Sequence, residues 1–546
     1  MHPSKCGIGR EQFTYLTFYP DISTKRQGMD LSGKSFKTFT DRREALKKQY
    51  SAKQAEKQHS KGKLTAQERI NLLFDPGTFE EIDAFVTPAS IPVEFGKVEK
   101  SYGDGVIVGY GKVNGRTVFA YAQDFIIMGG SLGLVHSKKI CTVQEMALKM
   151  GAPCIGMMDS GGARIQEGVA SLAGYGSIFH NIIQSSGIIP QISVIMGPCA
   201  GGAVYSPALT DFVFMVNHTS FMFVTGPNVV KEVLNEEVSF DELGGAEVHA
   251  MKSGVAHMIY DDEENTILAL KKFLAYLPSN NVENPPVVPF DDSTPLINNK
   301  LRDIVPDDPN KAYDVKDVIN LVVDRNSFFE TAELFAPSIV TGFARLKGKT
   351  IGVVANQPKV LAGVLDIDSS TKGARFIRFC DAFNIPILTF EDVPGFLPGM
   401  DQEHAGIIRH GAKMLFAYSE ATVPRITIIL RKAYGGAFIV MNSKNLGGDF
   451  NFAWPTAEIA VMGPDGAVAI LYRKELAESK SPVEMKKELV KKYRDKVANP
   501  FIADENGYID EVIDPADTRK KVISAFEALN NKWVKVPSRK HGNMPL

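Results

Sequence analysis

Residues 195–203 read IMGPCAGGA, and residues 430–437 read LRKAYGGA. Each stretch follows a short run rich in β-branched residues, 192–195 in one half of the chain and 426–429 in the other. Each is therefore predicted to be a strand that ends in a Gly-Gly turn and leads into a helix. The first backbone N–H groups of a helix lack partners within the helix, so such a turn can hold an anion or a developing oxyanion. Two copies predict two anion sites.

The two Gly-Gly turns belong to a longer repeat. Gly202 and Gly436 occupy the same place in the two halves, and residues 109–113 and 342–346 recur upstream with nearly the same separation. A matched order of several landmarks indicates a duplicated domain rather than chance, and the period is far too long for a solenoid. We therefore predict two homologous domains in tandem, each of about 230 residues, which is at the upper end for single domains.

Hydrophobic periodicity places strands and helices in the same order in both halves. Glycine-punctuated alternation predicts hairpins, and helical patterns that alternate with short apolar strands favour an α/β sheet with helical crossovers. In chain order, we expect hairpins over 78–124, a helix ending at 149 and a strand over 152–158, then hairpins over 338–355, a helix over 371–383 and a strand over 385–390.

Four segments are predicted along the chain. Prolines with clustered Asn and Asp over 278–308 indicate a linker that cannot be helical. Residues 1–28 are interpreted as an over-long start or a transit peptide. The charged residues between Asp41 and Arg69 are expected to form a solvated helix face. The expected segments are an N-terminal extension of unknown role over 1–40, a first domain over 41–284, a linker over 285–310 and a second domain over 311–546.

Composition indicates a large enzyme of a reducing compartment, and we expect it in the cytoplasm. The five cysteines form neither a CxxC pair nor a disulfide framework. No run of about 18 or more apolar residues occurs, so no membrane span is expected. The formal net charge is −2, with Lys and Arg interspersed among Asp and Glu, which argues against nucleic acid as a partner.

A second loop motif lies upstream of each Gly-Gly turn. Residues 159–168 read DSGGARIQEG, and residues 391–399 read EDVPGFLPG. An oxyanion hole generally needs two converging donors, and two strand-end loops of one domain can supply one each. The alternative is a tight turn that only permits close packing, but the paired loops and the duplication favour anion sites. The expected donors are Gly161 with Gly201 or Gly202 in the first domain, and Val393 with Gly435, Gly436 or Ala437 in the second.

Several of these motifs resemble one family. They are residues 160–168 (SGGARIQEG), 197–207 (GPCAGGAVYSP), 391–396 (EDVPGF), 431–437 (RKAYGGA), 453–463 (AWPTAEIAVMG) and 541–546 (HGNMPL). Together they resemble the carboxyltransferase (β) subunit of biotin-dependent acyl-CoA carboxylases, of the propionyl-CoA carboxylase β and methylmalonyl-CoA decarboxylase α type. The likeness extends from about Asp41 to the end of the chain.

The resemblance implies two crotonase-like (ClpP/crotonase) domains, with an active site between the first domain of one subunit and the second domain of another, usually in a hexamer. The first-domain loops would hold the thioester oxygen of an acyl-CoA, and the second-domain loops the ureido oxygen of biotin. Biotin would arrive on a partner, a biotin carboxyl carrier or biotin carboxylase subunit. No metal is implied. The catalytic candidates are Gly161, Gly162, Gly201, Gly202, Val393, Gly435, Gly436 and Ala437, and the substrate-binding candidates are Ala163, Arg164, Ala203, Tyr434 and Ile439.

Some candidates leave more than one interpretation open. Arg164 either stabilises its loop or contacts a CoA phosphate, since Arg suits bidentate phosphate contacts. Ile439 would line the acyl pocket, where an apolar residue permits a small acyl group without choosing between acetyl and propionyl. Residues 250–252 read AMK like a biotin attachment site, but their surroundings match the carboxyltransferase family, so we expect no biotin on Lys252. The histidines at 180, 249, 257, 404 and 410 are expected to be structural.

The implied reaction explains why two anion sites are needed. Carboxybiotin releases CO2 and leaves a biotin enolate that takes the α-proton of the acyl-CoA, and the thioester enolate captures the CO2. Both partners become oxyanions in turn, and no side-chain nucleophile or metal cluster is required. We therefore expect a carboxyltransferase acting on propionyl-CoA and methylmalonyl-CoA. The alternatives are the same chemistry run as decarboxylation in a sodium-pumping membrane complex, a biotin-independent crotonase-like hydrolase or isomerase, and a non-catalytic scaffold.

Overall fold

The computed structural model describes residues 34–49, 52–89, 101–290 and 293–546. Contacts divide the chain into two units, residues 1–50 and 51–546. In the first unit, the described residues form helix α1 (Lys34–Lys48). Most of the extension predicted over 1–40, including all of 1–28, lies outside the described residues. Among the described helices, none is long and apolar enough to cross a bilayer.

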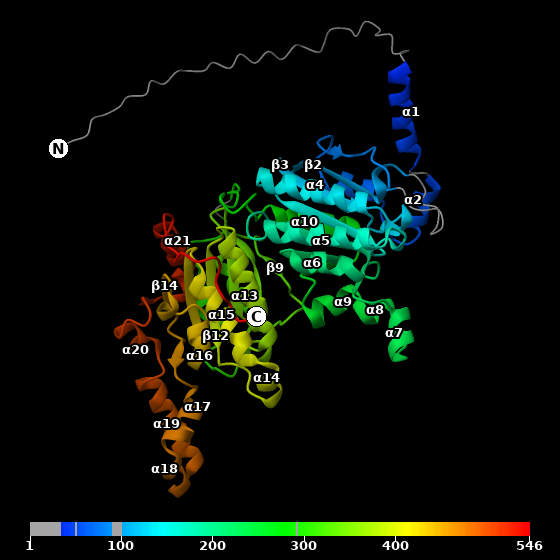
Figure 1. Cartoon of the computed structure of the whole chain (residues 1–546). Coiled ribbons are helices and arrows are strands. Elements are labelled where there is room, and N and C mark those ends of the chain that lie inside the picture. Colours follow the sequence, from blue (N-terminus) through cyan, green and yellow to red (C-terminus); the bar gives the residue numbers. More distant parts are fainter. Residues whose placement is uncertain (1–33, 50–51, 90–100, 291–292) are drawn as a thin grey trace, which may run out of the picture. The chain divides into compact units, whose positions relative to one another are not determined.

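Two eight-stranded mixed sheets organise the second unit (Figure 1). The first contains β1 (Glu80–Ile82), β2 (Val106–Val113), β3 (Arg116–Gln123), β4 (Cys154–Ser160), β5 (Gln191–Ala200), β6 (Phe212–Val216), β7 (Phe221–Phe223) and β8 (Met258–Tyr260). The second contains β9 (Phe329–Thr331), β10 (Ile339–Leu346), β11 (Lys349–Asn356), β12 (Ile387–Val393), β13 (Arg425–Tyr434), β14 (Phe450–Ala453), β15 (Glu458–Ala460) and β16 (Glu511–Val512).

The two sheets have the same strand order. The first runs β1-β2-β3-β4-β5-β6-β8 with β7 beside β5, and the second runs β9-β10-β11-β12-β13-β14-β16 with β15 beside β13. In both, an antiparallel hairpin (β2–β3 or β10–β11) leads into parallel strands. Because every strand has a counterpart in the other half, the predicted tandem duplication of an α/β domain is confirmed.

Helices connect the strands in both halves of the chain. They are α2 (Ala52–His59), α3 (Ala66–Leu73), α4 (Leu134–Met150), α5 (Val169–Ser185), α6 (Tyr205–Leu209), α7 (Pro227–Leu234), α8 (Phe240–Gly244), α9 (Ala246–Val248), α10 (Glu263–Leu274), α11 (Leu301–Ile304) and α12 (Val315–Val322). They continue with α13 (Ile367–Ala382), α14 (Met400–Ala405), α15 (Ile407–Glu420), α16 (Gly435–Val440), α17 (Pro464–Leu471), α18 (Arg473–Glu478), α19 (Pro482–Lys496), α20 (Pro500–Glu505) and α21 (Thr518–Ala528).

Element ends differ from the sequence-based prediction for identifiable reasons. Strands β4 and β12 each begin two residues later than expected, directly after Pro153 and Pro386, because a proline has no N–H to donate to the ladder. Helix α13 begins earlier than expected, at Ile367, because the Asp366 side chain accepts the Ser369 N–H in a capping box.

The segment predicted to be a non-helical linker contains one helical turn. Helix α11 lies between Pro295 and Pro306, in a stretch that has no proline of its own. The expectation that all of 278–308 is non-helical is therefore wrong at this turn, because proline excludes helix only at and near its own position. The boundaries of the four predicted segments stay a prediction.

The two sheets share part of their hydrophobic core. The ring of Phe212 on β6 lies 4.7 Å from that of Phe379 on α13, centroid to centroid, and 6.1 Å from that of Phe343 on β10. Phe376 on the same helix and Phe383 directly after it are also buried in this cluster, so this aromatic face packs inward. Aromatic edge-to-face pairs at these distances add to the stability that apolar burial provides.

Candidate active site

In each sheet, two neighbouring parallel strands carry the predicted loops at their carboxyl ends. In the first sheet, Ser160 at the end of β4 pairs with Cys199 near the end of β5. In the second, Val393 at the end of β12 pairs with Ala433 near the end of β13. Each upstream loop and its Gly-Gly turn are therefore neighbours in space. Carboxyl ends of parallel strands are a common location for ligand sites in α/β folds.

Both Gly-Gly turns have the same backbone geometry. Gly201 and Gly435 have φ angles of 64° and 60°, a region that favours glycine. Gly201 opens the 3₁₀ helix η5 (Gly201–Val204), which runs into α6, and Gly435 opens α16. Their N–H groups and those of Gly202 and Gly436 lie at helix starts, where no helical carbonyl precedes them as acceptor. The side chains of Ala203 and Ala437, which follow, are buried.

The loop after β4 uses most of its N–H groups internally. The bonds, in order, run from Gly161 N–H to the Gly129 carbonyl (2.9 Å), from Gly162 N–H to the Ser160 hydroxyl (3.1 Å) and from Arg164 N–H to the Leu132 carbonyl (2.9 Å). For the N–H of Ala163, no acceptor is found among the described residues. The N–H of Gly161, a donor expected from the sequence, is therefore already bonded in this structure, and its role toward a substrate stays a prediction. Ala163 presents the unbonded donor of this loop.

The loop after β12 repeats this pattern with one informative change. Pro394 stands in the place of Gly161 and has no N–H. Leu365 pairs with Phe396 in an isolated bridge, as Leu132 pairs with Ala163 in the first domain. Phe396 is thus the counterpart of Ala163. Val393, the donor expected from the sequence, lies within the ladder of β12, so the duplication favours Phe396 as the loop donor.

Arg164 is an internal anchor of the first loop. Its side chain is 1% exposed and pairs with Glu167 (2.7 Å) and Asp104 (2.8 Å). It also donates to the Ser131 carbonyl (2.9 Å). Burial raises the pKa of the Asp104 carboxyl, and the Arg164 guanidinium opposes that shift. Because the guanidinium is enclosed by these partners, the structure favours loop stabilisation over contact with a CoA phosphate.

Tyr434 directly precedes the second Gly-Gly turn and anchors the end of β13. Its hydroxyl donates to Glu458 on β15, and Arg494 on α19 binds the other oxygen of the same carboxylate (3.0 Å). Burial raises the pKa of the Tyr434 phenol above its ordinary value, so the phenol stays protonated and remains a donor. Tyr434 is buried, which indicates that it supports the turn and does not contact the substrate. Ile439 is half-buried on α16.

Buried charged groups lie directly below both loop pairs, and sequence reasoning missed them. Asp159 contacts Lys63 (2.6 Å) and Arg69 (3.0 Å), and Asp392 contacts Arg431 (3.0 Å). The solvated face expected between Asp41 and Arg69 is exposed where its charged side chains are described, as at Arg42 and Lys57, whereas Lys63 and Arg69 are 6% and 1% exposed. The available signal was the helical spacing of Ala66, Ile70 and Leu73, which places Arg69 on the apolar face of α3.

The histidines whose contacts the structure describes have structural roles. His257 accepts the Val213 N–H (3.1 Å), and burial lowers its pKa to about 3. His249 bonds to the Met222 carbonyl (2.7 Å). For His180 and His404 a structural role stays a prediction. Within the described ranges, no cluster of three or more His, Cys, Asp or Glu suited to a metal is found.

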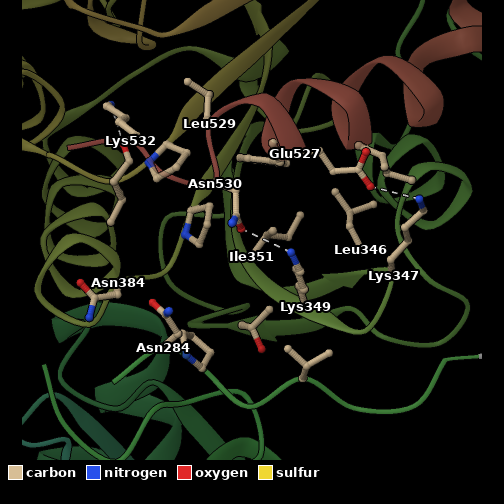
Figure 2. A pocket seen from close by; sticks show the side chains of 18 of the residues that line it. Asn284, Leu346, Lys347, Lys349, Ile351, Asn384, Glu527, Leu529, Asn530 and Lys532 are labelled. Atoms are coloured by element: carbon tan, nitrogen blue, oxygen red, sulfur yellow. Dashed lines mark hydrogen bonds and ion pairs between the residues drawn. The ribbon is translucent and has the colours of Figure 1, made fainter. Parts of the chain in front are cut away.

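A cavity of about 360 Å³ lies at the opposite edge of the second sheet (Figure 2). Its lining includes residues that precede β12 and β13, such as Asn384 and Pro424, and the start of β11 at Lys349. These are the amino ends of the parallel strands, whereas the Gly-Gly turns follow their carboxyl ends. The cavity is therefore separate from the candidate site.

Residues 57–544 match the family model described as the carboxyl transferase domain. This match spans most of the chain. The chain belongs to this family. Among its curated relatives, the propionyl-CoA carboxylase carboxyltransferase subunit of Haloferax mediterranei is 59% identical over 491 residues, 90% of this chain and 95% of the relative. The methylmalonyl-CoA decarboxylase α subunit of Propionigenium modestum is 51% identical over 519 residues, 95% of this chain and 100% of the relative.

Solved structures place the fold within the carboxyl transferases as well. The transcarboxylase 12S structure, a hexamer with methylmalonyl-coenzyme A bound, matches with a TM-score of 0.90 at 47% identity, over 96% of this chain and 100% of that one. A single-chain long-chain acyl-CoA carboxylase shares the fold at 24% identity, with a TM-score of 0.78. The expected pair of crotonase-like carboxyl transferase domains is confirmed.

Proposed function

We propose that this chain is the carboxyltransferase subunit of a biotin-dependent acyl-CoA carboxylase, which moves a carboxyl group between carboxybiotin and the α carbon of propionyl-CoA. The observation that carries the proposal is the duplicated pairing of a strand-end loop with a Gly-Gly turn, at Ser160 and Cys199 and again at Val393 and Ala433, in a carboxyl transferase. The names of the relatives and the methylmalonyl-CoA bound to transcarboxylase 12S support propionyl-CoA and methylmalonyl-CoA as the substrates.

In the first domain, the thioester oxygen of the acyl-CoA would accept N–H groups from Ala163 and from Gly201 or Gly202. Gly162 supports this loop, since its carbonyl accepts the Leu132 N–H (2.9 Å). These backbone donors are held in place before the reaction, so they stabilise the thioester enolate without reorganisation. Loss of one donor of such a hole costs on the order of 10²–10³ in rate.

In the second domain, the ureido oxygen of biotin would accept N–H groups from Phe396 and from Gly435, Gly436 or Ala437. Carboxybiotin supplies the carboxyl group when its carrier is bound. The residues fit a neutral ring oxygen that gains negative charge, because the donors lie at a helix start and no described carboxylate oxygen is recorded as bonded to them. Biotin attached to this chain is disfavoured, since Lys252 lies in a helical segment, the π-helix η6 (His249–Ser253).

Each complete site would require two subunits, in a hexamer that binds a biotin-carrying partner. Two observations support this. The fold matches a hexameric relative over nearly its whole length. Large apolar side chains are exposed in the single chain, with Ile165 of the first loop at 89% and Ile408 of α15 at 80%. Exposed apolar groups of this size favour burial against another subunit. The free cysteines recorded at 141, 154, 199 and 380 support the proposed cytoplasmic location.

The same chemistry run as decarboxylation is the second candidate. It is favoured by the identity of 51% to a methylmalonyl-CoA decarboxylase α subunit, over all of that relative. The two functions share the site and differ in the partners that bind the subunit. Copurification therefore separates them: a soluble biotin carboxylase identifies the carboxylase, and membrane subunits identify the decarboxylase.

The direct test is incubation of the purified chain with methylmalonyl-CoA, with and without free biotin. Propionyl-CoA is followed by mass spectrometry. We expect loss of the carboxyl group that depends on biotin. Equal loss without biotin would overturn the proposal and identify a crotonase-like decarboxylase.

A further inference from the structure

Both sheets contain the same irregularity directly before the loop pairs. The strand registers run from Met158↔Ile195 to Ser160↔Cys199 in the first sheet, and from Glu391↔Ile429 to Val393↔Ala433 in the second. A single aspartate, Asp159 or Asp392, therefore faces a bulge of residues 196–198 or 430–432. A bulge bends its strand and redirects the chain that follows. In both domains, the strand that delivers the Gly-Gly turn is thus bent opposite a buried carboxylate.

In the first domain, the carboxylate is tied to the bulge through Arg69. The Asp159 carboxylate lies 2.6 Å from Lys63 Nζ and 3.0 Å from Arg69 Nη1. The same guanidinium donates to the bulge carbonyl of Met196 (3.3 Å) and to Glu263 (2.7 Å). All four charged side chains are buried. Arg69 therefore connects the end of β4, which carries the first loop, with the stretch of β5 that carries the turn.

In the second domain, the same link is made with different residues. The Asp392 carboxylate accepts Arg431 Nε (3.0 Å) and the Tyr313 hydroxyl (2.9 Å) on one oxygen. Its other oxygen accepts the Lys432 N–H (3.1 Å), which lies in the bulge. Arg431 also belongs to the bulge and donates to the Lys311 carbonyl (2.7 Å). Asp392 thus binds both the backbone and a side chain of the strand that carries the turn.

The cation comes from different places in the two domains. Gly197 is the first-domain counterpart of Arg431, and a Cβ there would lie 2.0 Å from Asp159 Oδ1 and 2.5 Å from Lys63 Nζ. The first domain therefore has no side chain at this bulge position, and its cations are Lys63 and Arg69 of α3 instead. One buried contact between a carboxylate and a cation has been built twice from different chain positions. The two domains share the geometry of the loop and the Gly-Gly turn. This repetition indicates that the contact is required by that geometry.

We propose that Asp159 and Asp392 are positioning residues, one for each anion site, which fix the bulge and thereby the spacing between the loop N–H and the turn N–H groups. Both carboxylates are buried beneath the loops and act through them. The assignment of Asp159 to the acyl-CoA half and Asp392 to the biotin half rests on the function proposed above. A misplacement of about 1 Å at such a site can cost about 100-fold in rate.

The test compares Asp159→Asn and Asp392→Asn in the full-length protein with methylmalonyl-CoA and free biotin. We expect Asp159→Asn to lower kcat and raise the KM for methylmalonyl-CoA, together about 10–100-fold in kcat/KM, with the KM for biotin unchanged. Asp392→Asn should also lower kcat, but it should raise the KM for biotin and leave the KM for methylmalonyl-CoA unchanged. Arg431→Lys, which keeps a cation, should retain more activity than Arg431→Met. Glu511→Gln is the control for Asp392→Asn, because it removes a half-exposed carboxylate charge from β16 of the same sheet.

A second readout needs neither substrate. Hydrogen exchange should rise in residues 160–168 of Asp159→Asn and in residues 394–399 of Asp392→Asn, and not in the reverse combination. If Asp392→Asn does not assemble, Tyr313→Phe removes one bond to the same carboxylate and should shift the KM for biotin in the same direction. Equal changes in both KM values, or exchange that rises in both loops of each variant, would overturn the proposal. Absence of biotin-dependent turnover in the wild type would overturn only the proposed function, since the exchange pattern is independent of it.

Discussion

At the scale of single residues, Gly435 and Gly436 are alike in sequence but differ in the fold. Gly435 has a φ of 60°, and a Cβ there would lie 3.0 Å from the Val461 carbonyl, whereas a Cβ on Gly436 would meet no described atom within 4 Å. We expect Gly435→Ala to lower biotin-dependent turnover by about 10²-fold, because the strained turn displaces its donors. Gly436→Ala should keep the melting temperature of the wild type. The same strain should lower the melting temperature of Gly435→Ala, so an equal loss of melting temperature in both variants would contradict this distinction.

The buried side chain of Glu391 leads us to expect that the stability of the fold depends on pH. Its side chain is buried, and no described group donates to either oxygen, whereas the equivalent residue of the first domain is Met158. Burial, and then the neighbouring Asp392, raises the Glu391 pKa well above its ordinary value. A carboxyl with a raised pKa in the folded state is tolerated below its unfolded pKa of about 4.3 and destabilises the fold as pH rises above that value.

We therefore expect Glu391→Met to gain stability over the wild type as pH rises. The gain should grow by up to about 1.4 kcal/mol for each pH unit between the unfolded pKa and the raised folded pKa, so it should be clearly larger at pH 8 than at pH 5. Thermal unfolding of both proteins at the two pH values measures it. A gain that is the same at both pH values would show that the carboxyl of Glu391 does not titrate differently in the folded and unfolded states.

At the scale of elements, the loop between β4 and α5 depends on Arg164. Arg164→Met would leave the buried carboxylates of Asp104 and Glu167 without their cation, and breaking a buried pair in this way costs about 3–5 kcal/mol. Chemical denaturation and turnover measured together should show both destabilisation and loss of activity. Arg302→Met is the control, since its partner Asp514 is exposed and such surface pairs contribute about 0–1 kcal/mol. Comparable losses in the two variants would argue against Arg164 as the loop anchor.

Local elements could be predicted from sequence, but the groups that connect them could not. The strand, Gly-Gly turn and helix at Gly201 and Gly435 are encoded within a few neighbouring residues, so their pattern was sufficient. The bond from Gly161 N–H to Gly129 joins two loops, and only the folded chain shows that Ala163 is left as the donor. The pairing of Asp159 with Arg69 spans a long sequence separation. A charged residue in such a pair looks like a surface residue until its partner is known.

At the scale of the whole molecule, each chain carries two half-sites that would serve two different active sites. The shared core at Phe212 and Phe379 joins the two domains of one chain, and in the proposed hexamer another subunit would cover exposed apolar residues such as Ile165. A defect in one domain should therefore disable a site built with a neighbouring subunit. Subunits with defects in different domains should then complement each other.

Coexpression of two inactive variants tests this arrangement. Gly201→Ala impairs the first domain through its positive φ, and Gly435→Ala impairs the second. In oligomers assembled at random from equal amounts of both, about one quarter of the sites would combine two intact domains, so we expect turnover of about a quarter of wild type. Each variant alone, and a mixture of separately assembled oligomers, should stay near background. If the coexpressed pair is no more active than the better single variant, both halves of each site come from one chain, and the site is not formed between subunits.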